Sequence, residues 1–194
     1  MKTNTKKIVG IGLFTAIVVV LQLVASTIKL GVFSITLVLA PMIVGAALYG
    51  IGAGAWLGLV FGVTVLISGD AGTFLAINPI GTVVTVLAKG TLAGLAAASV
   101  YKLIEKKNSL VAVITAGVAC PVVNTGIFLI GCCLFFMPTI REWATAAGVP
   151  NAGTFMVTSF VGLNFVIELA VNLVLSTTIV KIINIGIKSD KVHI

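Results

Sequence analysis

Long apolar runs fill most of this chain, and short polar or glycine-containing stretches separate them. The breaks fall at about residues 26–31, 49–52, 68–72, 105–109 and 137–153. A helix needs about 20 apolar residues to cross a bilayer, so the runs predict membrane-spanning helices. We expect six spans, at about residues 8–25, 34–49, 52–67, 80–101, 110–136 and 154–183. Five spans are the alternative, because the second and third candidates are short.

The composition supports this prediction by excluding other classes of protein. Hydrophobic residues make up 59% of the 194 residues and charged residues 9%, with a mean hydropathy of +1.26. Soluble domains are roughly 45–50% apolar and about 25% charged, so a soluble or disordered chain is excluded. The three cysteines lie in one apolar run and the single histidine is His193, so we expect no metal site and no cofactor. We therefore expect an all-α integral membrane protein with one domain, residues 1–194.

The lysines predict which side each loop faces. Nine of the twelve Lys and Arg residues fall on one side if both termini are cytoplasmic, whereas Lys29 and Arg141 fall outside and Lys89 lies within a span. The inside set is Lys2, Lys6, Lys7, Lys102, Lys106, Lys107, Lys181, Lys188 and Lys191. This bias follows the positive-inside rule and needs an even number of spans. The net charge of +7 thus reflects topology and contact with the lipid bilayer, and no nucleic acid partner is expected.

Small residues recur at four-residue spacing on three predicted spans. Helices in a bilayer associate through close packing of such residues. The repeats are Gly50, Gly54, Gly58 and Gly62; Gly90, Gly94 and Ala98; and Gly12 and Ala16. Packing inside the bundle explains all three, but the first span is the least enclosed by sequence neighbours. We therefore assign the face carrying Gly12 and Ala16 to a partner protein.

Polar side chains within the predicted spans indicate a site. Ionisable groups there are costly and face the bundle interior or a cavity, and Lys89 and Glu168 are of this kind. At about 1.5 Å per residue, Lys89 lies about 13 Å below the outer surface, at the depth of Asn124 and Asn164 on two other helices. Glu168 lies one turn deeper. A Lys89–Glu168 ion pair that only fixes helix register is the alternative to a ligand cavity.

The polar stripe continues outward from Lys89, so we expect a site open to the outside. Thr85 lies one turn above Lys89, and Asn78 belongs near the outer surface. Arg141, in the outer loop, is a second candidate cation. Enzyme chemistry finds little support, because the only histidine is terminal and no phosphate-binding loop or catalytic carboxylate pair is present. A transporter built from this chain would need an outside source of energy.

Three short stretches resemble the substrate-binding S-components of energy-coupling-factor (ECF) vitamin transporters. They are Gly-Leu-Phe-Thr-Ala at 12–16, the apolar hairpin at 40–58 with its Pro and Gly-x-x-x-Gly, and Pro-Val-Val-Asn-Thr-Gly at 121–126. The resemblance implies a six-helix subunit of a prokaryotic plasma membrane, with a transmembrane T-component and two cytoplasmic ATPases as partners. It implies that Gly12 and Ala16 replace an Ala-x-x-x-Ala motif that contacts the T-component. It also implies that the loop at about 26–33 closes over the ligand.

The ligand is expected to be a vitamin or related micronutrient. A lone cation with amides suits a small anionic ligand, so pantothenate is the first expectation and riboflavin the second. An aromatic content of 7% argues mildly against a large flat ring. The competing functions are a self-sufficient secondary transporter or channel and a membrane scaffold.

Overall fold

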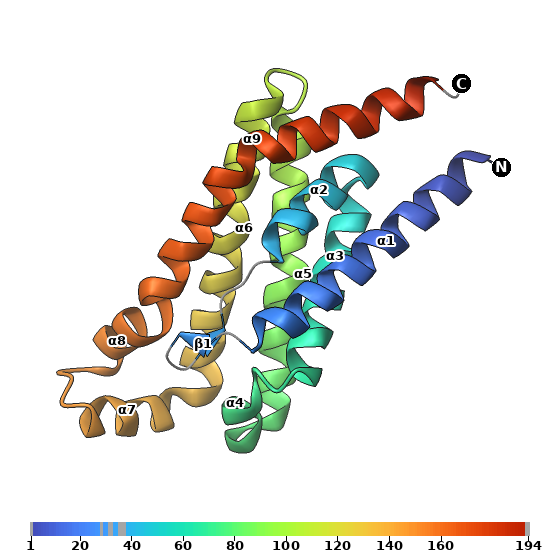
Figure 1. Cartoon of the computed structure of the whole chain (residues 1–194). Coiled ribbons are helices and arrows are strands. Elements are labelled where there is room, and N and C mark those ends of the chain that lie inside the picture. Colours follow the sequence, from blue (N-terminus) through green and yellow to red (C-terminus); the bar gives the residue numbers. More distant parts are fainter. Residues whose placement is uncertain (1, 28, 31–32, 35–37, 193–194) are drawn as a thin grey trace.

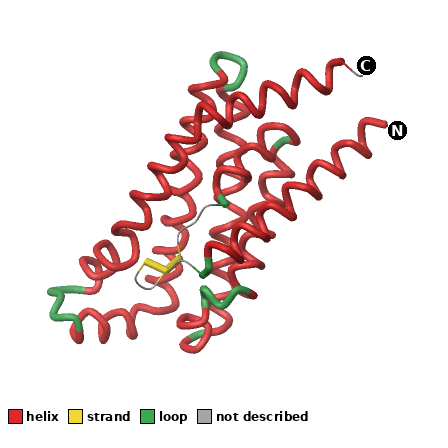
Figure 2. The backbone as a smooth tube through the Cα atoms, viewed as in Figure 1, coloured by secondary structure: helices red, strands yellow, loops and turns green. Residues whose placement is uncertain are grey.

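The computed structural model describes residues 2–27, 29–30, 33–34 and 38–192. Helices make up nearly all of the described chain (Figure 2). The elements in chain order are α1 (Lys2–Ala25), β1 (Lys29–Leu30), β2 (Phe33–Ser34), α2 (Leu39–Tyr49), α3 (Ile51–Ile67), α4 (Gly72–Ile77), α5 (Pro79–Ile104), α6 (Ser109–Gly131), the π-helix η1 (Cys132–Phe136), α7 (Met137–Ala146), α8 (Ala152–Phe155), the π-helix η2 (Met156–Val161) and α9 (Gly162–Val192).

Four helical stretches of the described chain are long and apolar enough to cross a bilayer. They are Thr5–Ala25, Pro79–Ile104, Ser109–Ala146 and Ala152–Leu175. The apolar helices α2 and α3 have 11 and 17 residues, or about 16 and 26 Å of helix against a hydrocarbon core of about 30 Å. The expected all-helical fold is thus confirmed, and its long apolar helices are consistent with a membrane protein, whereas the count of six spans stays a prediction.

Two segments differ from the sequence-based expectation. The helix expected over 34–49 begins only at Leu39, and Phe33–Ser34 instead pairs antiparallel with Lys29–Leu30. Aromatic and β-branched residues dominate the sequence just before α2, and these favour extended backbone. The stretch at 137–153, expected to be a loop with at most a short surface helix, is largely helical, because α7 buries Ile140 and Ala144 on one face and keeps its polar face exposed.

The glycine repeats of α3 and α5 hold these two helices together. A Cβ on Gly54 would lie 2.6 Å from the Gly94 carbonyl oxygen, and one on Gly62 would lie 2.9 Å from that of Val86. Between them, Gly58 and Gly90 face one another so closely that neither position has room for a methyl group. Gly50 has a different role: its backbone, with a φ of 92°, forms the turn between α2 and α3. The expected packing of small residues inside the bundle is confirmed for this helix pair.

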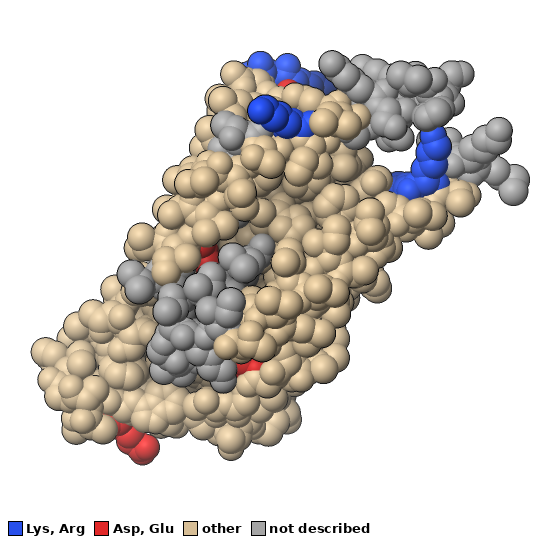
Figure 3. Space-filling view, viewed as in Figure 1, with Lys and Arg blue, Asp and Glu red and all other residues tan. Residues whose placement is uncertain are grey.

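Helix α1 begins and α9 ends at the same end of the bundle, beside the turn between α5 and α6 (Figure 1). Most described lysines belong to this end. They are Lys6 and Lys7 on α1, Lys102, Lys106 and Lys107 around the turn, and Lys181 on α9. In the space-filling view the visible Lys and Arg side chains gather here (Figure 3). Helices α4 and α7 lie at the opposite end (Figure 1). The bundle therefore has one strongly basic end.

Candidate functional site

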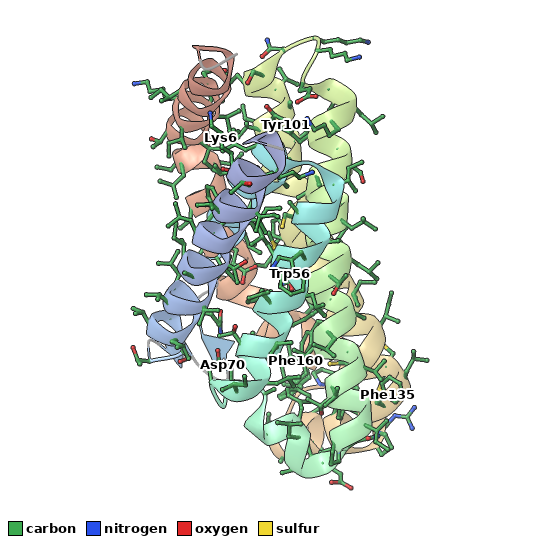
Figure 4. All side chains as sticks on the ribbon, turned by 90° about the vertical axis from the view of Figure 1, so that its right-hand side faces the viewer. Lys6, Trp56, Asp70, Tyr101, Phe135 and Phe160 are labelled. Atoms are coloured by element: carbon green, nitrogen blue, oxygen red, sulfur yellow. The ribbon has the colours of Figure 1, made fainter. Side chains whose placement is uncertain are left out.

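A cavity lies among the helices in the half of the bundle away from the basic end. It contains about 840 Å³ of space not filled by atoms, counting its opening to solvent. Asp70 and Phe160, which line it, lie in the opposite half of the bundle from Lys6 and Tyr101 (Figure 4). Its polar lining side chains come from five segments: Gln22 of α1, Asp70 of the α3–α4 turn, Thr82, Thr85 and Lys89 of α5, Asn124 and Thr125 of α6, and Glu168 of α9.

Helix α5 presents its polar stripe to this cavity. Thr82, Thr85 and Lys89 are three and four residues apart, a spacing that puts them on one face of a helix. The helix begins at Pro79, where a missing N–H costs nothing, and the Asn78 side chain caps it. The Gly81 N–H donates to Asn78 Oδ1 at 2.9 Å. Gly90 and Gly94 of the same helix face α3, so this packing fixes the direction in which the stripe points.

The Lys89 ammonium group lies over two aromatic rings of the cavity wall. Its Nζ is 5.7 Å from the centre of the Phe61 ring and 5.5 Å from that of Phe128. Both distances are within the reach of a cation–π interaction. Glu168 and Asp70 also line the cavity. Lys89 therefore lies over two rings inside the cavity, where an ammonium group offers N–H donors to a bound molecule.

Two buried polar atoms of the lining have no hydrogen-bond partner in the described part of the chain. Thr85 and Asn124 are each 5% exposed. Among the described residues, neither Thr85 Oγ1 nor Asn124 Oδ1 has a partner. An unsatisfied buried polar group costs about 1–3 kcal/mol. Because these two atoms lie on adjacent helices and line one cavity, a molecule bound in it can supply the missing bonds.

Gln22 and Asp70 join α1 to the turn between α3 and α4. Gln22 Nε2 donates to Asp70 Oδ2 at 2.7 Å, and the Gln22 side chain is buried. Both residues line the cavity. The bond ties the end of α1 to the cavity lining.

The structure brings together Lys89, Asn124, Thr85 and Glu168 in the lining of one cavity, and leaves Asn78 and Arg141 outside that lining. Asn78 lies outside the lining because its side chain caps α5, and Arg141 lies on the exposed polar face of α7. The side chain of Asn164 lies outside the described residues. Gly12 and Ala16 are exposed on α1, away from the cavity. Ligand contact by these four residues therefore stays a prediction, and all four line the same cavity.

The aromatic walls are the part of the site that sequence reasoning missed. Six of the ten phenylalanines in the chain line the cavity. They are Phe61, Phe74, Phe128, Phe136, Phe160 and Phe165. The average aromatic content hid this concentration, because the six come from segments more than 100 residues apart. The signal in the sequence was the group of aromatic residues between 128 and 165.

Comparison with protein families identifies a match over most of the chain. The family model described as "ECF transporter, substrate-specific component" matches residues 6–180. Searches of curated proteins and of solved structures return no match. The matched range runs from the first turns of α1 into α9 and includes every element that lines the cavity. The chain therefore belongs to the family of substrate-specific components of ECF transporters.

Proposed function

We propose that this chain captures a vitamin or related micronutrient from outside the cell and delivers it to partner subunits for ATP-driven uptake. The observation that carries the proposal is the cavity itself. It holds a lysine, and two buried polar atoms, Thr85 Oγ1 and Asn124 Oδ1, lack a described partner there. A simple ion pair that fixes helix register accounts for neither atom. From the sequence, pantothenate is the first ligand expectation and riboflavin the second.

The positions of the charges support an outward-facing site. In bacterial membranes the loops rich in Lys and Arg face the cytoplasm. The end with α1, the α5–α6 turn and the end of α9 is the basic one, so it faces the cytoplasm of a prokaryotic cell in our proposal. The cavity lies in the other half, where Asp70 and Phe160 lie (Figure 4). A nutrient would then enter from outside.

Helix α1 supports a partner on the lipid-facing side. Gly12 and Ala16 are exposed, and a Cβ added at Gly12 would meet no described atom within 4 Å. Neighbouring apolar side chains are also exposed: Val9 is 65% and Leu13 61% exposed. A small-residue face of this kind allows the close approach of another transmembrane helix. We propose that the T-component docks here, and that two ATPases bind the complex from the cytoplasmic side.

Replacement of Lys89 tests ligand capture. We expect Lys89→Ala to lower ligand affinity by at least about 30-fold, since loss of a buried charged contact costs roughly 2 kcal/mol or more. Lys102→Ala is the matched control, because Lys102 lies on the same helix but pairs with Glu105 at 3.1 Å outside the cavity. The ligand is the small molecule that co-purifies with the detergent-solubilised chain, identified by mass spectrometry. Equal affinity in the two variants would remove Lys89 from the site.

Co-expression with the partner subunits tests transport. We expect the chain to co-purify with a transmembrane subunit and two ATPases, and the complex in liposomes to take up the ligand only with ATP. Uptake by the isolated chain, driven by an ion gradient, would instead indicate a secondary transporter. A chain that binds no small molecule would indicate a scaffold.

A further inference from the structure

A second hollow of the molecule lies between α1 and α3 and opens at the surface of the bundle. It contains about 660 Å³ of space not filled by atoms, counting its open side. We call it the α1–α3 groove, and its lining residues are Val19, Leu23, Trp56, Leu59, Val60, Val63, Thr64 and Ile67. Phe61 and Val65 of α3 line the central cavity instead, so the two hollows lie on different sides of this helix.

The lining of the α1–α3 groove is uncharged, and its polar side chains already have partners. Among the described lining residues only Trp56 and Thr64 carry a polar side-chain atom. The Trp56 indole N–H donates to Thr15 Oγ1 at 3.1 Å, and the Thr64 hydroxyl donates to the Val60 carbonyl oxygen at 2.8 Å. A polar occupant would therefore exchange its hydrogen bonds for an apolar wall, which is unfavourable. The groove complements an uncharged hydrocarbon.

The dimensions of the groove fit a hydrocarbon chain better than a helix. From Trp56 to Ile67 α3 rises about 16 Å. Spread over this length, 660 Å³ corresponds to a channel of roughly 40 Å² in cross-section. A helix with its side chains is about 10–12 Å across and fills at least about twice that section. Non-bonded carbon atoms approach to about 4 Å, so one or two extended hydrocarbon chains fit in the channel.

The groove covers one half of the membrane thickness. Trp56 lies near the middle of the bundle, whereas Asp70, just after the end of α3, lies in the half away from Lys6 (Figure 4). The groove thus runs from mid-bundle to the end of α3. Its length of about 16 Å matches half of a hydrocarbon core about 30 Å thick. With the basic end in the cytoplasm, as proposed above, this half is the outer leaflet.

We infer that the α1–α3 groove binds an acyl chain of an outer-leaflet phospholipid. This site is separate from the central cavity, and the inference goes beyond the proposed capture of a nutrient. An empty groove would forfeit the dispersion contacts that a filled one makes, and a bilayer supplies acyl chains of the right length. The bond to Thr15 holds Trp56 at the mid-membrane end of the site, and Ile67 marks the end near the lipid headgroups.

Fluorescence quenching tests the inference, because Trp56 itself lines the groove. A Trp143→Phe chain has Trp56 as its one tryptophan. The whole chain in detergent, stripped of lipid, would be titrated with phosphatidylcholine carrying bromine atoms near the methyl ends of its chains. The same lipid without bromine controls for effects other than quenching. We expect the emission to fall to a plateau once each chain holds a lipid. A fall that follows the lipid content of the micelles without a plateau would overturn the inference.

Two valine variants locate the lipid. Val63 lines the groove and is 41% exposed, whereas Val84 of α5 is 52% exposed and lies outside both hollows. Val63→Phe fills the groove, so we expect it to raise the lipid concentration at half-quenching at least about tenfold. Val84→Phe should leave that concentration unchanged. Leu23→Phe, which fills the groove from α1, is the second test variant if Val63→Phe does not fold. Equal half-quenching in a folded test variant and the control would overturn the inference.

The T-component is the competing occupant, because Val19 and Leu23 continue the side of α1 to which we assign its docking. A titration without a plateau, together with loss of co-purification in Val63→Phe, would assign the groove to the T-component and overturn the lipid site. Either result leaves the capture of a nutrient to be decided by Lys89→Ala. The lipid titration and the ligand-binding test therefore report on separate claims.

Discussion

The contact between α3 and α5 makes Gly58→Ala the most direct test of how the bundle is held together. In a bilayer no hydrophobic effect drives helices together, so their association depends on close packing. A Cβ on Gly58 would lie 2.8 Å from the Gly90 carbonyl carbon and 3.1 Å from Thr91 Cα. These neighbours are backbone atoms, which cannot turn away as a flexible side chain can. The helices themselves must move apart.

The size of the effect follows from these distances. Non-bonded carbon atoms approach to about 3.5 Å, so α3 and α5 have to separate by roughly 0.7 Å at this point. Overpacking of this kind costs about 1–3 kcal/mol of the free energy of unfolding. That corresponds to about a 5- to 150-fold change in the folding equilibrium. With about 2–4 °C per kcal/mol for a chain of this size, we expect a melting temperature lower by about 2–12 °C.

The cysteines supply the assay. Cys120 and Cys132 are buried, so a thiol-reactive fluorophore labels them only when the chain unfolds. Cys133 is exposed, and Cys133→Ser removes its background signal. Thermal unfolding would be followed in detergent micelles for Gly58→Ala and for Gly52→Ala. Gly52 lies on the same helix, but a Cβ there would meet no described atom within 4 Å.

The comparison between the two variants decides the matter. We expect Gly52→Ala to melt at or above the temperature of the parent chain, because alanine is the better helix former. A Gly58→Ala variant as stable as Gly52→Ala would refute the argument that backbone contact between α3 and α5 requires glycine at this position.

Three further substitutions separate binding, folding and assembly. Asn124→Leu removes a buried amide oxygen without a described partner, so we expect the ligand-free chain to melt at a higher temperature and ligand affinity to fall in calorimetry; a drop in both would contradict this. Asn78→Ala removes the cap of α5, so we expect a loss of about 0.5–2 kcal/mol in thermal unfolding with unchanged affinity, whereas weaker binding would return Asn78 to the site. Gly12→Leu should leave ligand affinity intact and abolish co-purification with the T-component; an intact complex would move the docking face elsewhere.

Much of the helical framework was predictable because periodic signals govern it. The apolar runs indicated helices at 80–101 and 110–136, and the structure has α5 over Pro79–Ile104 and α6 from Ser109. The four-residue glycine repeats indicated close packing, and α3 and α5 meet through them. Depth along straight helices also put Lys89 and Asn124 at one level, and both line the cavity. Such arguments need only the rise per residue and the cost of polar groups in hydrocarbon.

Other features depended on local chemistry or on contacts between distant segments. Asn78 was assigned to the ligand, but an asparagine before Pro79 is equally suited to cap a helix, and there it accepts from Gly81. The short α2 reflects extended backbone at Phe33–Ser34 that an apolar run does not distinguish from helix. The phenylalanine walls come from α3, α4, α6 and later segments, so no window of sequence contains them together. The average aromatic content of the chain therefore gave no indication of the phenylalanine walls, because these are assembled from several segments that are distant in sequence.

The two sides of helix α5 differ in how well they tolerate substitution. Towards α3, Gly90 and Gly94 admit no additional atom, so that side resists almost any replacement. Towards the cavity, Thr82, Thr85 and Lys89 contribute side chains to the lining, and of these Thr85 also packs against Gly131 of α6. In evolution, ligand specificity can therefore change through substitutions on the cavity side of α5, while the packing of its other side against α3 is kept.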